Sequence, residues 1–513
     1  MSKKYPYLAI FLLLFLYTFV FPTSEKAIYI GSFLEPESLD PGQSWDSTST
    51  LYSFNIFDKL VQVNPETMAI EPSLAQSWET KDNGTVWIFK LRKGVTFHDG
   101  TSFDADAVVF SFKRQMDKTF TYRYYQFPLF DEIFSNLKDV KAIDTYTVAF
   151  YLEEPFYPFL ATLTAAGASI VSPTAVKKHQ ARFTQNPVGT GPYMLKTWTK
   201  GNRLVLEANP NYWRGKPGIP QFICIFNPKY EPLHNMFLNG KLDLLLNYSI
   251  SRSLGLKKLD WVTIKSIPSL SIQYFAFNLN NPLLKKKKIR KALRYLWNKR
   301  ILKLTYQDYV TPTHSLLPRG MYGYEKAPET ETFSIEKAGA LLKEEKQPPG
   351  IVLEFPFLYE GDILGYDIIK RFSQDLKSAG IELKIIRLSA EEYTKRIAAG
   401  DYDLTFFGWV ADYPDPHSII SSMFNSQLQK EGFPNLSSFG KNEILSQITL
   451  AAREGNPSIR EKMYKKINRT ISDEVLCIPL FQNNFTIIYN NKKIDRIVLT
   501  PLEHIPLFEM TGK

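Results

Sequence analysis

Helix-like and strand-like segments alternate along this chain, and the alternation limits its fold more than any other feature. In the second half, helical patterns and short apolar runs follow one another at regular spacing. The helical patterns lie at 337–345, 367–379, 390–399 and 458–471, and the strand-like runs at 351–357, 381–387 and 404–408. Such alternation is typical of an α/β fold in which helices cover a sheet.

The first half also mixes strands and helices. Residues 84–92 alternate between apolar and polar side chains, which predicts a half-buried strand after the hairpin signal Asn83-Gly84. A second alternating strand is predicted at 146–152. Between them, Asp104 is placed to cap a helix that ends near Met116. The whole chain is therefore predicted to be α/β.

The length of 513 residues is several times that of a typical domain of roughly 150, so two or more lobes are expected. Hydrophobic residues make up 44% and charged residues 22%, which excludes a disordered, collagen-like or multi-span membrane chain. The net charge of +10 is spread along the chain, so no nucleic-acid partner is predicted. The basic run at 285–288 could be a nucleic-acid or membrane-surface patch. The apolar stripe beneath it instead favours the solvated start of a helix over 285–302.

The first residues have the order of a secretory signal peptide. Lys3 and Lys4 precede an apolar stretch at 7–21, and small residues follow as far as Ser24. The stretch is shorter than the ~20 residues that span a bilayer, so an uncleaved anchor is the weaker interpretation. No cysteine follows it, as a lipid-anchored lipoprotein would require. We therefore expect a signal peptide at 1–24 and a periplasmic protein that is soluble after cleavage.

The chain has two cysteines, Cys224 and Cys477, each between apolar residues. Two buried free thiols are the favoured interpretation, since an isolated cysteine in a strand usually behaves as a small hydrophobe. One long-range disulfide is the alternative. Neither a disulfide framework nor a metal site of the CxxC type can be built from two such residues.

No catalytic motif is found in the sequence. The chain lacks GxSxG, HExxH and GxxxxGK[ST], and its six histidines are scattered without the i, i+4 spacing of a helical metal pair. Glu153 and Glu154 are adjacent carboxylates, but the following Pro155 favours a turn over an acid/base pair. We therefore predict a binding protein rather than an enzyme, with no cofactor and no metal.

Several segments, taken together, resemble the family 5 extracellular solute-binding proteins, which include the oligopeptide, dipeptide and nickel-binding components of bacterial ABC importers. The signature stretches are 74–79, 87–100 and 103–108, and further matches in the same order are 35–41, 187–193, 209–213, 277–278 with 282–283 and 289–292, and 401–416. The last of these looks most like the peptide-binding branch. The resemblance runs from about Lys26 to the C-terminus.

This resemblance implies an α/β, bilobal clamp of the type II periplasmic-binding-protein class, with an extra subdomain in the larger lobe. Lobe one is expected at 26–268 and 479–513, and lobe two at 269–478. Two short apolar strands, 275–278 and 478–482, are candidates for the hinge. The expected partners are short peptides and the permease subunits of an ABC transporter, and the protein is expected to be a monomer.

The resemblance also assigns ligand-binding residues. A peptide brings an ammonium that must be paired when a closing cleft removes water. Asp412 matches the family aspartate that binds this ammonium, although it could instead cap the turn before Tyr413. Trp409 matches a tryptophan that walls a side-chain pocket, with simple core packing as its alternative.

Two further site residues are less clearly assigned by the resemblance. Glu35 lies in a loop that lines the site through its backbone, or is a plain turn carboxylate. Tyr122 corresponds to a cleft tyrosine, although packing is the stronger interpretation for it. His98 is expected to be structural. The run at 404–408 lacks the arginine that some oligopeptide binders use for the peptide carboxylate, so no residue is assigned to that contact.

Other functions stay open at this stage. The same clamp could bind glutathione, haem or a nickel chelate. The segment around Asp412 argues against nickel, because a site for a nickel chelate does not need a carboxylate to pair with an ammonium. A peptide chaperone or a signalling receptor could use the clamp without transport. An exported hydrolase is the most distant alternative.

Overall fold

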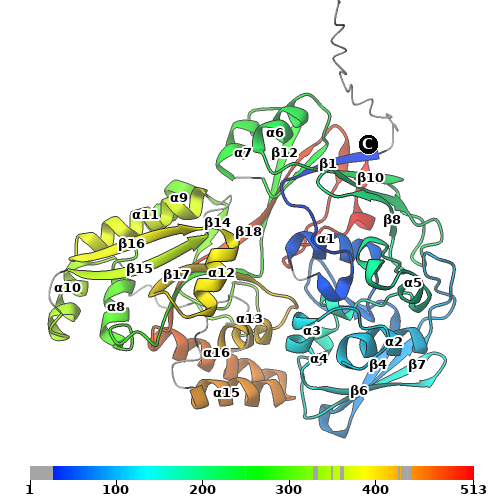
Figure 1. Ribbon diagram of the computed structural model, residues 1–513, viewed down its shortest axis with the longest axis horizontal. Helices are drawn as coiled ribbons and strands as arrows, with labels where there is room; N and C mark the ends of the chain where they lie inside the picture. The colour runs from blue at the N-terminus through cyan, green and yellow to red at the C-terminus, as the bar shows by residue number, and fades with distance from the viewer. Residues whose placement is uncertain are drawn as a thin grey trace, which may run out of the picture.

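The computed structural model describes residues 27–513 except 45, 249, 327–332, 348–349, 359–362, 426–427, 429–433, 435 and 437–440. The signal peptide predicted at 1–24 lies outside the described residues. Two bodies lie side by side in Figure 1. The first holds most of the N-terminal half, and the second holds the segment from β13 to α16. The predicted mixture of helices and strands in two bodies is therefore observed.

A ten-stranded sheet joins the two bodies. Its strands run in the order β17-β13-β18-β11-β1-β10-β9-β8, and β12 and β14 also pair with β18. The strands are β1 Ala27–Ser32, β8 Tyr193–Thr199, β9 Arg203–Ala208, β10 Gln221–Phe226, β11 Leu244–Leu246, β12 Val262–Pro268, β13 Ser271–Phe277, β14 Val310–Pro312, β17 Leu404–Val410 and β18 Cys477–Asn490. Only β1 pairs in parallel within this sheet, with β10 and β11.

Strand β18 is long enough to belong to both bodies. Its first part pairs with β13 of the second body, from Ala276 opposite Cys477 to Gln273 opposite Phe481. Its last part pairs with β12 of the first body, ending with Val262 opposite Asn490. The apolar run at 478–482, expected at the hinge, is part of this strand.

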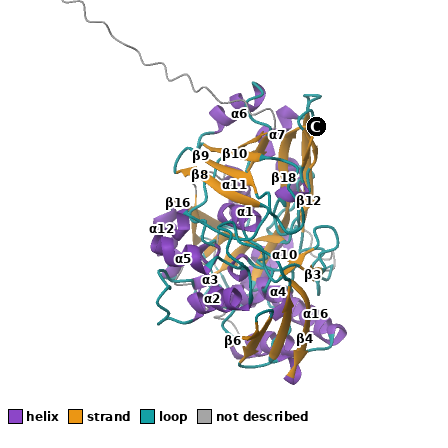
Figure 2. Ribbon diagram, turned by 90° about the vertical axis from the view of Figure 1, so that its right-hand side faces the viewer, coloured by secondary structure: helices purple, strands orange, loops and turns teal. Residues whose placement is uncertain are grey.

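Smaller sheets complete the two bodies. A four-stranded sheet in the first body has the order β4-β5-β7-β6, and Figure 2 shows it at the opposite end of the molecule from α6 and α7. In the second body, β15 and β16 pair in parallel. Their strands and the remaining hairpins are β2 Val61–Val63, β3 Ile70–Pro72, β4 Ala75–Lys81, β5 Val86–Leu91, β6 Leu137–Asp144, β7 Thr147–Leu152, β15 Ile351–Leu358, β16 Ile381–Leu388, β19 Ile494–Arg496 and β20 Thr511–Gly512.

The helices of the first body are α1 Ser47–Ile56, α2 Ala105–Met116, α3 Pro128–Ile133, α4 Phe159–Thr162, α5 Pro173–His179, α6 Tyr230–Leu238 and α7 Ile250–Leu256. Those of the second are α8 Lys287–Tyr295, α9 Arg300–Tyr306, α10 Ile335–Glu344, α11 Ile363–Lys377, α12 Ala390–Ala398, α13 Pro416–Phe424, α15 Lys441–Arg453 and α16 Pro457–Asp473. Asp104 caps α2 by accepting a hydrogen bond from the Ala107 amide at 2.9 Å, so the predicted acidic cap is confirmed.

The single helix expected at 285–302 is wrong. The structure divides it into α8 and α9, because the turn between them places Trp297 in the core, where its ring contacts that of Phe275 at 5.6 Å. The Asn298 side chain then accepts a hydrogen bond from the Arg300 amide at 3.2 Å and begins a new turn.

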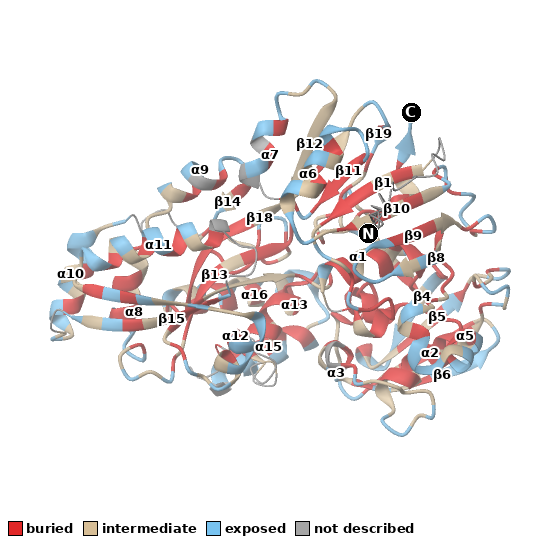
Figure 3. Ribbon diagram, turned by 45° about the horizontal axis from the view of Figure 1, so that its top comes forward, coloured by how far each residue is buried: buried red, intermediate tan, exposed pale blue. Residues whose placement is uncertain are grey.

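Each body has its own hydrophobic core. The core of the second body is formed by residues from Leu270 to Phe481 together with Leu502. Two clusters of the first body are formed by residues up to Leu246 and from Ile487 onward, with Tyr413 as an exception. Figure 3 shows the buried residues concentrated on the central strands and the exposed ones on outer helices such as α10. The burial of each large apolar side chain contributes roughly 1.5–3 kcal/mol.

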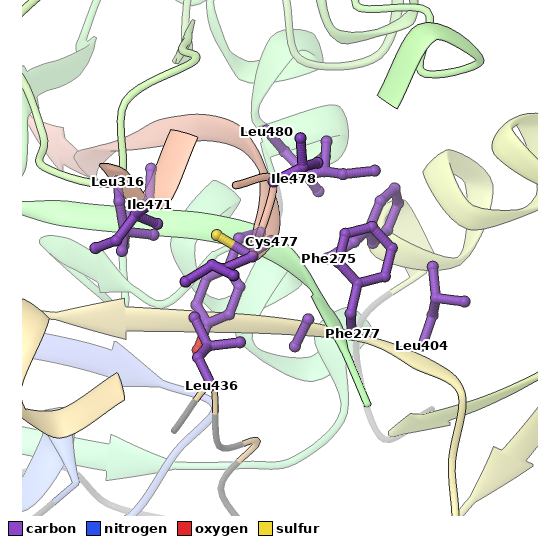
Figure 4. Packing of buried hydrophobic residues seen from close by; sticks show 14 of the residues in the cluster. Phe275, Phe277, Leu316, Leu404, Leu436, Ile471, Cys477, Ile478 and Leu480 are labelled. Atoms are coloured by element: carbon purple, nitrogen blue, oxygen red, sulfur yellow. The ribbon is translucent and has the colours of Figure 1, made fainter. Parts of the chain in front are cut away.

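Both cysteines are buried and free. Figure 4 shows the sulfur of Cys477 among apolar side chains that include Phe275 and Leu436. Burial raises the pKa of both thiols to about 12. The prediction of two buried thiols is confirmed, and the alternative of a long-range disulfide is not.

Candidate functional site

The candidate site lies where α13 of the second body meets α3 of the first. The Ser422 hydroxyl on α13 lies 2.6 Å from the Glu132 carboxylate on α3. The His417 ring contacts that of Phe156 at 5.0 Å, and Tyr413 packs within a core cluster of the first body. These contacts bring the end of β17 against the first body.

Asp412 is positioned by the end of β17. The neighbouring Ala411 amide donates to the Leu270 carbonyl at 2.9 Å, which continues the pairing between β17 and β13 by one residue. The Asp412 amide donates to the Ser418 hydroxyl oxygen at 2.9 Å. Burial raises the pKa of the Asp412 carboxyl to about 6, although hydrogen bonds from the Ser418 and Trp409 side chains oppose the shift. The carboxylate is thus held in a site that disfavours its charge.

Trp409 lies on β17, opposite Ile272 of β13. Its half-buried ring packs against the core of the second body. A Cβ at its neighbour Gly408 would lie 2.2 Å from the amide end of the Gln273 side chain, which would have to move. The structure therefore brings Trp409 and Asp412 together, as the local motif predicted, while Trp409 also contributes to packing.

Glu132 is a further carboxylate at this site that the sequence did not reveal. Burial and, to a smaller extent, the negative charge of Asp412 raise the pKa of Glu132 to about 7, although the hydrogen bond from Ser422 opposes the shift. One of its oxygens, Oε2, is buried and has no hydrogen-bond partner among the described residues. No motif marks Glu132 in the sequence, because its closeness to Asp412 depends on the docking of two segments that are far apart in the chain.

Glu35 and Tyr122 lie elsewhere in the first body. The Glu35 carboxylate accepts hydrogen bonds from the Trp198 indole at 2.8 Å and from the Gly201 amide at 2.8 Å, so it ties its loop to the hairpin of β8 and β9. The Tyr122 ring packs against the Phe110 ring at 5.6 Å. Both side chains are accounted for by contacts within the first body, and their ligand-binding roles stay predictions.

His98 is held by the glycine-rich segment at 187–193. Its Nδ1 accepts a hydrogen bond from the Gly189 amide at 3.3 Å, and its Nε2 lies 2.9 Å from the Gly191 carbonyl. A Cβ at Gly189 would lie 2.2 Å from the Ile56 carbonyl oxygen, which explains the glycine. Burial lowers the pKa of His98 to about 4. These contacts agree with the expected structural role.

A buried ion pair borders the site. Asp415 caps α13 by accepting from the His417 amide at 2.9 Å, and its two oxygens accept from the guanidinium of Arg460 at 2.7 Å each. His417 accepts or donates a 3.0 Å hydrogen bond with the Tyr413 hydroxyl, and burial lowers the pKa of this histidine to about 4. The charge of Arg460 is thus engaged by Asp415. No lysine or arginine forms an ion pair with Asp412 or Glu132 within the part of the chain that the structure describes.

Across the described ranges, none of the helices combines the length and the apolar character needed to cross a membrane.

Comparison with known proteins gives a consistent result. The model for bacterial extracellular solute-binding proteins, family 5 (middle region), matches residues 69–431. The dipeptide-binding protein of Escherichia coli K12 is 27% identical over 477 residues, covering 88% of each chain. Heme-binding protein A of Haemophilus influenzae is 27% identical over 486 residues, covering 90% of this chain and 86% of the relative.

A solved structure agrees with these relatives. The ABC transporter-associated periplasmic binding protein of Helicobacter pylori, in complex with the peptide STSA, superposes with a TM-score of 0.83 at 25% identity. The match covers 95% of this chain and 98% of that one. The predicted type II periplasmic-binding-protein fold is therefore confirmed.

Proposed function

This chain belongs to the family 5 bacterial extracellular solute-binding proteins, and we propose that it captures short peptides between its two lobes for delivery to the permease of an ABC transporter. The observation that carries this proposal is the state of Asp412. Its carboxylate lies between the two bodies, burial disfavours its negative charge, and no cation among the described residues pairs with it. A peptide's terminal ammonium would supply the missing charge through a hydrogen bond roughly twice as strong as a neutral one.

The lobes are proposed at 26–268 with 479–513 and at 269–478. The strand pairing favours a hinge at two crossings, one between β12 and β13 at 269–270 and one within β18 near 482–484, rather than at 275–278. Bending at two strands would let the lobes close on a ligand, as in other periplasmic binding proteins. Trp409 would then wall the space beside the bound ammonium.

The proteins of this family bind solutes for transport, which fits a non-enzymatic role. We extend this to a periplasmic protein released after cleavage near Ser24 and acting as a monomer with its permease. Intact mass of the protein from an exporting host tests the first point, since the product should lack roughly the first 20 to 28 residues. A full-length, membrane-extracted product would contradict it.

The test of the ligand class is the mass of any small molecule that copurifies with the protein and is released on denaturation. Peptides of two to several residues would support the proposal. Calorimetric titration with a free-amine dipeptide, with haem and with glutathione should then show binding of the dipeptide. Tight binding of haem alone would replace peptides with a non-peptide solute as the ligand.

A further inference from the structure

We propose that Glu132 is a second ligand-binding carboxylate, which together with Asp412 binds one amino group of the ligand from the opposite lobe. This inference rests on the proposed function and deepens it. The amino group would become the bridge between the lobes, and ligands that carry a free amino group would be selected over those that do not.

The first line of support is the position of Glu132 between the bodies. It lies on α3, and its Oε1 is 2.6 Å from the Ser422 hydroxyl on α13, across the junction of the bodies. The same α13 carries Ser418, which lies 3.4 Å from the Asp412 carboxylate. One turn of one helix therefore touches both carboxylates.

The second line of support is a shortage of protons in this arrangement. The Ser422 hydroxyl carries one proton but has two acceptors in reach, Glu132 Oε1 at 2.6 Å and the Ser418 carbonyl at 2.8 Å. The single proton is shared between these two acceptors, so the Glu132 carboxylate accepts at most a shared hydrogen bond from Ser422. A buried carboxylate with so few donors favours its protonated form, and a ligand's ammonium would displace that proton to solvent.

The third line of support is the charge balance around the pair. The buried Oε2 of Glu132 has no hydrogen-bond partner among the described residues, and the charge of Asp412 acts on Glu132. Besides these carboxylates, the titratable and charged groups next to the pair are Tyr413, Asp415, His417 and Arg460. On α3 itself, the exposed Asp131 faces Arg123 at 4.0 Å rather than the pair. The Arg460 charge is engaged by Asp415, and His417 is neutral near pH 7 because burial lowers its pKa to about 4.

Two buried carboxylates that act on one another cannot both ionise easily, but one cation between them stabilises both charges. An ammonium has three donors, enough to reach both carboxylates at once. Because the two carboxylates come from different bodies, such a bond would form only when the lobes are closed. The ligand's amino group would thus couple binding to closure.

The experiment compares full-length Glu132→Gln with wild type by calorimetric titration of the dipeptide Ala-Leu and its N-acetylated form. Glu132→Gln should weaken Ala-Leu binding by roughly tenfold or more. It should leave the already weak binding of the acetylated peptide nearly unchanged, because the deleted contact is missing there. The matched control is Asp131→Asn on the same helix, whose carboxylate is 45% exposed and should not alter binding.

Two more measurements separate ligand contact from a structural role. Ser422→Ala removes the contact between lobes but keeps both carboxylates, so it should weaken both peptides to the same degree. Titration at pH 6.5 in buffers of different ionisation enthalpy should show proton release by wild type and less release by Glu132→Gln.

Unchanged Ala-Leu affinity and unchanged proton release in a folded Glu132→Gln protein would overturn the inference while leaving the proposed function intact. An equal loss for both peptides would also overturn it, since Glu132 would then act only through Ser422. If wild type binds no amine-bearing peptide, the proposed function itself is wrong, and the inference falls with it.

Discussion

Two carboxylates buried inside the bodies, Asp40 and Asp415, differ from Asp412 at the junction between the bodies. Within the first body, Asp40 faces Arg114, and both side chains are at most 2% exposed. Within the second, Asp415 faces Arg460 through two hydrogen bonds of 2.7 Å. At the junction, no described cation pairs with Asp412.

The difference distinguishes carboxylates whose charge is paired within the protein from carboxylates whose charge would be paired by a ligand. A buried carboxylate that meets a guanidinium in bidentate geometry is satisfied by the protein alone. An ionised carboxylate with a raised pKa and no cation costs folding free energy, and a cation that binds beside it offsets that cost. A positively charged group between the bodies would therefore stabilise both Asp412 and Glu132.

The largest effect is expected inside the second body. Arg460→Met should leave Asp415 buried without its cation and lower the free energy of unfolding by about 3–5 kcal/mol. Urea denaturation followed by circular dichroism measures the change. A loss of under about 1 kcal/mol would show that solvent reaches Asp415 and would erase the contrast between the two regions.

The next effect concerns ligand binding at the junction. Asp412→Asn keeps the shape but removes the charge, so the peptide ammonium would be buried without its counter-ion at a cost of about 2–5 kcal/mol. Calorimetry should show a loss of roughly thirtyfold or more in affinity. N-acetylation of the peptide should lower its affinity for wild type by a similar factor. The effects of Asp412→Asn and N-acetylation on the binding free energy should together be less than additive, because both delete the same interaction. Wild-type affinity in Asp412→Asn would make this residue a turn cap.

A third effect appears without ligand. Folding raises the pKa of Glu132 to about 7, so the folded state binds the proton more tightly than the unfolded state does. The stability that comes from this tighter proton binding is fully present at low pH and is lost as the pH rises through 7, where folded Glu132 becomes charged. Glu132→Gln should therefore raise the free energy of unfolding at pH 8 by about 1–3 kcal/mol and have much less effect at pH 4. Urea denaturation at both pH values measures the difference, and destabilisation at pH 8 would contradict the assignment.

The smallest effect is expected on the surface. Lys395 and Glu391 form a 2.6 Å ion pair on α12, but their side chains are 74% and 79% exposed. Lys395→Met should leave the urea midpoint unchanged, because solvent screens such pairs. A shift of the urea midpoint as large as that caused by Arg460→Met would mean that burial does not decide how much an ion pair contributes to stability.

Much of the fold could be predicted because its signals are local. The cap at Asp104, the alternating strands and the segment that became β18 are each visible within a short window of sequence. The break between α8 and α9 was missed, since it depends on Trp297 entering a core formed by residues far along the chain. A continuous helical pattern gives no sign of such a tertiary contact.

The site was predictable only where its residues share one motif. Asp412 and Trp409 are three residues apart and stay together in space. Glu132 is 290 residues from its contact Ser422, and no single-sequence pattern joins them. Glu35 was correctly placed in a loop, but the sequence could not show that the Trp198 indole donates a hydrogen bond to its carboxylate.

Strand β18 has a consequence for the order of folding. It is the last long strand of the chain, yet it lies between β13 and β11 in the ten-stranded sheet and also pairs with β12. Neither body can complete its share of that sheet until residues 477–490 arrive, so the contacts that close the sheet span more than 200 residues of chain, as between Thr263 and Tyr489. Contacts of such long range form slowly. We expect truncated chains that end before β18 to stay sensitive to protease in both halves, and the full chain to become resistant in both halves together on refolding.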